Sequence, residues 1–272
     1  MKSAITVSLV PEARGGPFVF WDGLEAAFER AAALGFDAVE IFPSGPEAVE
    51  GARIEGLRQR TGLAVAAIGT GAGWVKHKLH LCSPESAVRG RARRFVAEMI
   101  EVAAAQGAPA ILGSMQGRVE AGVERAQALD WLEEALREAS ELARQAGQTF
   151  LYEPLNRYET NLFNRQQEAA HFLEERGLSG VGILADWFHM NLEEANLGEA
   201  LEALGPRLAH VHFADSNRRA VGFGHTDAGA LWRVLRGMGY AGYLSAEVVA
   251  WPNSEEAAER TMRTFRALQA ME

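Results

Sequence analysis

The chain has 272 residues, of which 48% are hydrophobic, so it can bury a large core. Its 27 basic and 36 acidic side chains give a formal charge of −9, which disfavours nucleic acid and anionic membranes as partners. Because there is one cysteine, Cys82, and no apolar run of the length of a membrane span or secretion signal, we expect a cytoplasmic protein without a disulfide.

Short apolar runs alternate with longer amphipathic ones along the chain, as in repeated strand–helix units. The helices are clearest where leucine and alanine recur every three or four residues and a glycine ends the pattern. The eight expected strands are residues 5–9, 38–42, 64–68, 110–113, 149–153, 181–185, 208–213 and 243–247. Two expected helices are clear, residues 84–106 and 123–146, and residues 24–34 and 255–268 complete the outer set at either end.

Eight strands that alternate with about eight helices predict an α/β fold, a single (β/α)8 TIM barrel that spans residues 1–272 as one domain. An open doubly wound sheet is the alternative, but it usually has a glycine-rich phosphate-binding turn after its first strand. The segment Gly15-Gly16-Pro17 does not match that turn, and no linker divides the chain. The active site of such a barrel lies at the C-terminal ends of its strands.

Four candidate metal ligands stand one at the end of each of the last four expected strands. They are Glu153, Asp186, His212 and Glu247, separated by about one strand–helix unit each. If successive strands are parallel neighbours, the four side chains converge. Three carboxylates and one imidazole suit a single divalent ion such as Mn²⁺, Mg²⁺ or Co²⁺. A shared cation explains the positions of all four residues better than loop capping does, because burying an isolated carboxylate costs free energy.

The segments around these ligands resemble a known family. Residues 153–160 (EPLNRYET), 186–191 (DWFHMN) and 210–218 (HVHFADSNR) are similar to the D-tagatose 3-epimerase/allulose epimerase group of the xylose isomerase-like TIM-barrel superfamily. The resemblance is specific over residues 149–250 and only architectural before them. It implies that Glu153, Asp186, His212 and Glu247 hold one divalent ion, Mn²⁺ by preference. It also implies that Glu159, His189 and Arg218 contact the sugar.

A carbohydrate isomerase or epimerase needs a group that removes a proton next to a carbonyl. A divalent ion stabilises the enediolate that forms, and two carboxylates on opposite faces of the sugar can exchange the roles of acid and base. We expect Glu153 and Glu247 to form this pair. Proton return to the other face gives an epimer, and return to the adjacent carbon gives an isomer. The sequence leaves open which occurs, which sugar reacts and whether it is phosphorylated.

Other residues near the expected strand ends allow further predictions. Trp74, after the third strand, is expected to stack on a sugar face, whereas His77 and His80 are better explained by a flexible basic loop. Glu159 would orient either Arg157 or the sugar, and the alternative is an ordinary salt bridge within the loop.

His212 should ligate through one ring nitrogen while a second acceptor holds the other. Asp227 or Asp215 could provide that acceptor. Glu40, within the second strand, is expected to face the barrel interior or a neighbouring strand.

Three alternative functions are compatible with parts of this pattern. An inosose dehydratase or a hydroxypyruvate isomerase shares the ligand set. An endonuclease IV-like phosphodiesterase would need further histidines after the third and fourth strands, where the sequence has Gly69-Thr70 and Gly113-Ser114. A non-catalytic binding protein would not need the opposed glutamates. The resemblance also favours a homo-oligomer.

Overall fold

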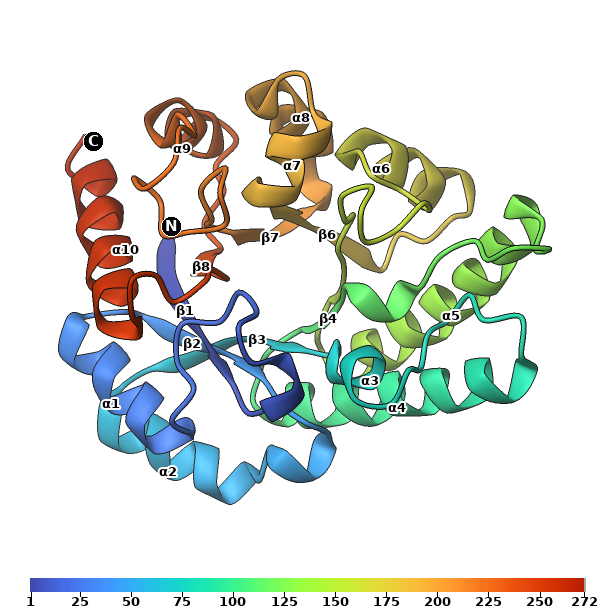
Figure 1. The fold of residues 1–272 in the computed structure, drawn as a ribbon, viewed down its shortest axis with the longest axis horizontal. Coiled ribbons are helices and arrows are strands. Elements are labelled where there is room, and N and C mark those ends of the chain that lie inside the picture. Colours follow the sequence, from blue (N-terminus) through green and yellow to red (C-terminus); the bar gives the residue numbers. More distant parts are fainter. Residues whose placement is uncertain (272) are drawn as a thin grey trace.

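A computed structural model describes residues 1–271, and they form a closed parallel barrel surrounded by helices (Figure 1). Each strand pairs with the next along the chain, and β8 pairs with β1 to close the ring. The predicted (β/α)8 TIM barrel is confirmed. The strands are β1 (Lys2–Ser8), β2 (Ala38–Phe42), β3 (Ala64–Gly69), β4 (Ala110–Leu112), β5 (Phe150–Tyr152), β6 (Val181–Asp186), β7 (Leu208–His212) and β8 (Tyr243–Ala246).

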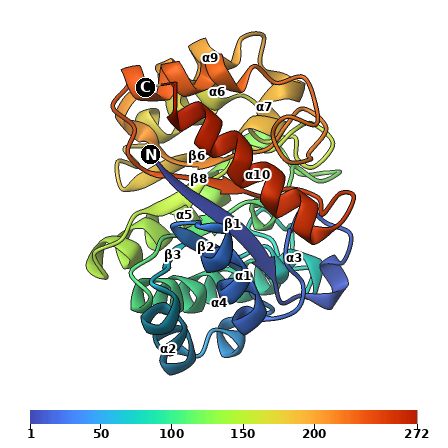
Figure 2. The same cartoon turned by 90° about the vertical axis from the view of Figure 1, so that its left-hand side faces the viewer.

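The helices form the outer ring, and the last unit closes on the first because α10 packs against α1 and β1 (Figures 1 and 2). No helix of the described residues is long and apolar enough to cross a membrane. The α-helices are α1 (Leu24–Leu34), α2 (Gly51–Thr61), α3 (Ala72–Val75), α4 (Ser86–Ala105), α5 (Arg125–Gln145), α6 (Gln166–Glu175), α7 (Trp187–Glu193), α8 (Leu197–Leu204), α9 (Ala228–Gly237) and α10 (Ser254–Gln269). Short 3₁₀ turns are η1 (Pro11–Ala13), η2 (Pro46–Ala48), η3 (Ser114–Gln116) and η4 (Gly205–Arg207).

The interior of the barrel changes from apolar to polar toward the C-terminal ends of the strands. Small apolar side chains such as Ala38 form a buried cluster near the start of β2. Glu40 lies two residues further along β2 and therefore on the same face, since side chains alternate along a strand. His210 and His212 share a face of β7 for the same reason. These polar groups adjoin the four candidate metal ligands, of which His212 is one.

Two short helices lie in loops that the sequence pattern did not identify as helical. They are α3, after β3, and α7, after β6. The side chain of Asp186 starts α7 by accepting the backbone N–H of Phe188 at 2.8 Å. The strand therefore passes into the helix with no turn residues between them, which explains why the pattern concealed this boundary.

Candidate active site

The four predicted metal ligands converge at the C-terminal end of the barrel. Asp186 and His212 are the last residues of β6 and β7, and Glu153 and Glu247 directly follow β5 and β8. Their four ligand atoms all lie within 4.8 Å of one another. The barrel topology thus brings together four side chains that are far apart in the sequence.

The facing atoms of this cluster have the arrangement expected of a cation site. Nδ1 of His212 lies 3.4 Å from Oε1 of Glu153, 3.6 Å from Oδ2 of Asp186 and 3.6 Å from Oε2 of Glu247. Within residues 1–271, the first three of these atoms are buried and have no hydrogen-bond partner. Carboxylate oxygens buried in this way need a positive charge. The donor set, three oxygens and one imidazole nitrogen, fits a divalent ion.

Without a bound cation to balance the negative charge of this cluster, some of its groups hold protons. Burial raises the pKa of Glu153 to about 7, and the nearby Glu247 and Asp186 carboxylates also raise it against the effect of His212. Burial lowers the pKa of His212, but the carboxylates, Glu40 foremost, hold that pKa well above its usual range. Burial also raises the pKa of Asp186, yet His189, His212 and Arg218 lower it to about 2. A cation that binds to His212 and Glu153 would therefore displace protons from them.

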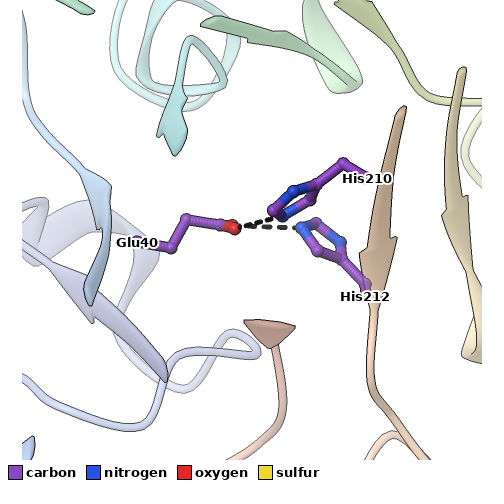
Figure 3. A group of neighbouring side chains, drawn as sticks. All are labelled: Glu40, His210 and His212. Atoms are coloured by element: carbon purple, nitrogen blue, oxygen red, sulfur yellow. Dashed lines mark hydrogen bonds and ion pairs between the residues drawn. The ribbon is translucent and has the colours of Figure 1, made fainter. Parts of the chain in front are cut away.

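Glu40 holds the opposite side of the His212 ring (Figure 3). Its two carboxylate oxygens lie 2.8 Å from Nε2 of His210 and 3.0 Å from Nε2 of His212, and all three side chains are buried. A proton on Nε2 of His212 leaves the Nδ1 lone pair directed at the ligand cluster, the usual outer arrangement of a metal-binding histidine. The same three residues are close enough to form a second metal-binding group. The hydrogen bonds between Glu40 and the two histidines explain why they are close.

The prediction that Asp215 or Asp227 holds His212 is wrong. Asp215 accepts four backbone N–H groups of the loop after β7. Asp227 caps the start of α9 through the N–H of Ala230. Both acids are used to shape local backbone, and the partner comes instead from β2, 172 residues before His212. The inward-facing position of Glu40 was predicted, but not its function.

His189 presents an N–H group to the site. Nδ2 of Asn156 donates to Nδ1 of His189 at 2.7 Å, so the ring proton is on Nε2. That nitrogen lies 3.5 Å from Oδ2 of Asp186 and 3.8 Å from Oε1 of Glu153, without a hydrogen bond in the described chain. Burial lowers the pKa of His189 to about 4, so the ring is neutral at pH 7. The structure thus places His189 beside two of the candidate ligands, Asp186 and Glu153.

Arg218 lies on the other side of the cluster and connects two predicted site residues. Its Nη2 lies 2.9 Å from Oε2 of Glu247, and its Nη1 lies 3.3 Å from Oε1 of Glu159. The residue has a φ of 58°, in the left-handed region that non-glycine residues seldom adopt. Glu159 therefore orients Arg218 and not Arg157, which pairs with Glu193 instead.

Trp74 and His80 lie in the wall above the cluster. Trp74, on α3, lines the cavity over the ligands and is 39% exposed. His80 is buried, and its Nε2 lies 3.0 Å from Oε1 of Glu120. The prediction of a flexible basic loop is therefore wrong for His80, whereas His77 is exposed as that prediction requires.

The ends of β3 and β4 carry no additional ligands. Thr70 follows β3 and donates its hydroxyl to the carbonyl of Ile111, and Gly113 follows β4. A Cβ at position 113 would lie 2.5 Å from Oε2 of Glu153, so glycine makes room for that carboxylate. The three-metal arrangement of the endonuclease alternative has no ligands at these positions.

Comparisons with known proteins identify the family. A family model described as xylose isomerase-like TIM barrel matches residues 28–268. The chain belongs to this family. The L-ribulose 3-epimerase of Mesorhizobium japonicum is 31% identical over 231 residues, which cover 82% of this chain and 75% of that protein. The 3-dehydro-D-guloside 4-epimerase of Escherichia coli is 39% identical over 114 residues, 42% of this chain and 44% of that protein.

A solved structure agrees with the family assignment. The apo form of 3-keto-D-glucoside 4-epimerase from E. coli has a TM-score of 0.81 and 23% identity, covering 99% of this chain and 100% of that chain. At this identity the likeness concerns the fold. The predicted superfamily and the predicted class of carbohydrate isomerases and epimerases are confirmed. The kind of ion and the function of each site residue stay predictions.

Proposed function

We propose that this member of the family is a divalent-metal-dependent epimerase that inverts a carbon next to the carbonyl of a ketose or keto sugar. The observation that carries the proposal is the position of Glu153 and Glu247. They follow β5 and β8, on nearly opposite sides of the barrel, and their carboxylates belong to the same cluster of candidate cation ligands. The names of the similar 3- and 4-epimerases each describe inversion beside a carbonyl carbon.

The two glutamates provide the proton chemistry in this proposal. A bound divalent ion would stabilise the negative charge that develops on the carbonyl oxygen. In the metal-free cluster, burial raises the pKa of Glu153 to about 7, so this carboxyl group can hold a proton near neutral pH. The pKa of Glu247 is raised as well, chiefly by burial. One glutamate removes the proton from one face of the sugar, and the other returns a proton to the opposite face.

The remaining predicted site residues orient the sugar. The Nε2–H group of His189 is free to donate to a substrate oxygen, because its Nδ1 is already held by Asn156. Arg218 fixes Glu247 and offers further donors to hydroxyl groups. Glu159 positions that arginine, and Trp74 provides an aromatic face for a sugar ring.

The proposal includes several points of detail that rest on the sequence. Mn²⁺ is the proposed ion, and residues 1–272 are proposed to act as one domain. The proposed setting is the cytoplasm, the proposed assembly is a homo-oligomer, and the partner is a small sugar rather than nucleic acid. Metal analysis and analytical ultracentrifugation of the purified protein test the ion and the assembly.

Solvent hydrogen exchange tests the reaction. The Mn²⁺-loaded protein is incubated in deuterated water with a panel of ketoses and keto sugars, and the products are followed by NMR. We expect deuterium at the inverted carbon together with the epimeric product. Deuterium in an aldose would indicate an isomerase, and loss of a hydroxyl group would indicate a dehydratase. Absence of exchange with every substrate would refute the proposal.

A further inference from the structure

The cavity above the ligand cluster is larger than a single sugar needs. Its volume is about 590 Å³, and it extends from Glu153, His212 and Glu247 outward to the loops after β1, β3 and β4. A hexose has about 12 non-hydrogen atoms, and even at about 30 Å³ for each, the volume of a water molecule in the liquid, it would occupy about 360 Å³. More than a third of the cavity would then stay empty.

Aromatic side chains line the outer part of this cavity. Trp74 is partly exposed there, and its ring meets that of His80 edge to face at 5.5 Å between centroids. Phe18 and Phe42 stack at 4.4 Å between centroids in the wall on the β1 and β2 side. Flat apolar faces beside polar groups suit ligands that have both C–H faces and hydroxyl groups, as sugar rings do.

The charged side chains of the outer wall are balanced in sign. Glu12 and Arg14 line it from the loop after β1, and Arg118 and Glu120 from the loop after β4. A phosphate site usually has an excess of positive charge or a helix N-terminus, whereas here two carboxylates line the wall beside two arginines, and Glu120 also pairs with His80. Carboxylates and guanidinium groups together can bind hydroxyl groups as acceptors and donors. The wall therefore favours a neutral polyhydroxyl group over a phosphate.

We propose that the outer cavity binds a second, neutral sugar ring, so that the substrate is a keto-glycoside and not a free ketose or a sugar phosphate. This inference rests on the epimerase function proposed above. In a glycoside the anomeric carbon is blocked, so the carbonyl must lie at another ring carbon. The reacting ring then sits on the ligand cluster, and its partner ring lies against Trp74 and the charged side chains of the outer wall.

Matched substrates test this inference. A 3-keto derivative of a neutral disaccharide is compared with the same 3-keto ring as its methyl glycoside, with a free ketohexose and with a ketohexose phosphate. All four are assayed by deuterium exchange with the Mn²⁺-loaded protein. We expect kcat/KM for the disaccharide to exceed that for each of the others by at least about tenfold, because the second ring adds binding energy. A ratio near one, or preference for the phosphate or free ketose, would overturn the inference.

Variants show where the second ring binds. Trp74→Ala should bring the ratio between disaccharide and methyl glycoside to within about threefold, the loss expected for one aromatic contact. Arg118→Ala, at an exposed position, should lower the same ratio and serves if Trp74→Ala does not fold. Trp131→Ala, on α5 and outside the cavity lining, is the matched control and should keep the ratio. An unchanged ratio in both cavity variants contradicts the inference, whereas absence of exchange with all four substrates refutes the epimerase function itself.

Discussion

The floor and the wall of the cavity differ in where their residues come from and in how they are held. The floor consists of Glu153, Asp186, His212 and Glu247, at the ends of the last four strands, and their side chains are at most 14% exposed. The wall includes the exposed loop residues Glu12, Arg14, Trp74 and Arg118. Barrel topology fixes the floor, whereas the loops can change without moving it. We therefore expect catalysis to depend on the floor and substrate selection on the wall.

Removal of the metal should give the largest effect, because it disables the floor while the wall stays intact. Dialysis against a chelator should lower kcat on the order of a thousandfold or more, since a metal ion supplies several kcal/mol of charge stabilisation. Readdition of Mn²⁺ should restore activity at about one ion per chain. If metal analysis shows that the protein is metal-free and it is still fully active, catalysis does not depend on a metal ion at the floor.

Replacement of one acid–base carboxylate should have the next largest effect. Glu247→Gln keeps the shape of the side chain but cannot exchange a proton, so kcat should fall by about 10²–10⁴-fold. Deuterium exchange and circular dichroism measure the activity and the fold. Glu133→Gln is a suitable control, because this glutamate pairs with Arg137 on α5 and with Arg176 just after α6, away from the site. A Glu247→Gln protein with near-normal turnover would assign the proton transfer to another group.

Glu40 allows a test of whether the floor depends on the first half of the chain. Glu40→Gln removes the charge that orients His212, and the Mn²⁺ affinity should fall by about 10–100-fold, as for other outer partners of metal-binding histidines. Titration calorimetry gives the affinity and thermal unfolding gives the stability. Glu25→Gln, at an exposed ion pair, is the control. A loss of stability without a loss of affinity would limit Glu40 to a structural function.

The pH dependence of metal binding tests the protonation of the floor. His212, with a raised pKa, holds a proton that the metal displaces, and Glu153 holds another below its pKa of about 7. Affinity should therefore fall as the pH decreases, by about tenfold per pH unit for each proton released. Calorimetry between pH 8 and pH 6 should show the steeper dependence below pH 7. An affinity that does not vary with pH would contradict these protonation states.

The parts that the sequence predicted correctly are those that follow from periodicity. The eight strands and the convergence of Asp186 and His212 are examples, because parallel neighbours must bring their C-terminal ends together. The partner of His212 could not be found in this way. Asp215 and Asp227 are close to His212 in the sequence, whereas Glu40 lies across the barrel. Only the alternation of side chains along β2 and β7, which turns Glu40 and His212 toward the interior, relates these two residues. The buried position of His80 depends on Glu120 in another loop, a contact that has no periodic signal.

The Glu40–His212 hydrogen bond also sets a condition on how members of this family can recombine. A chimaera joined at Gly147, between α5 and β5, would take its loops after β1 to β4 from one parent and all four ligands from the other. Such a protein should inherit its substrate choice from the first parent and its reaction from the second. We expect the exchange to work only if the first parent provides a carboxylate at the position of Glu40, since Glu40 on β2 holds the ring of His212, a proposed ligand from the other half of the chain.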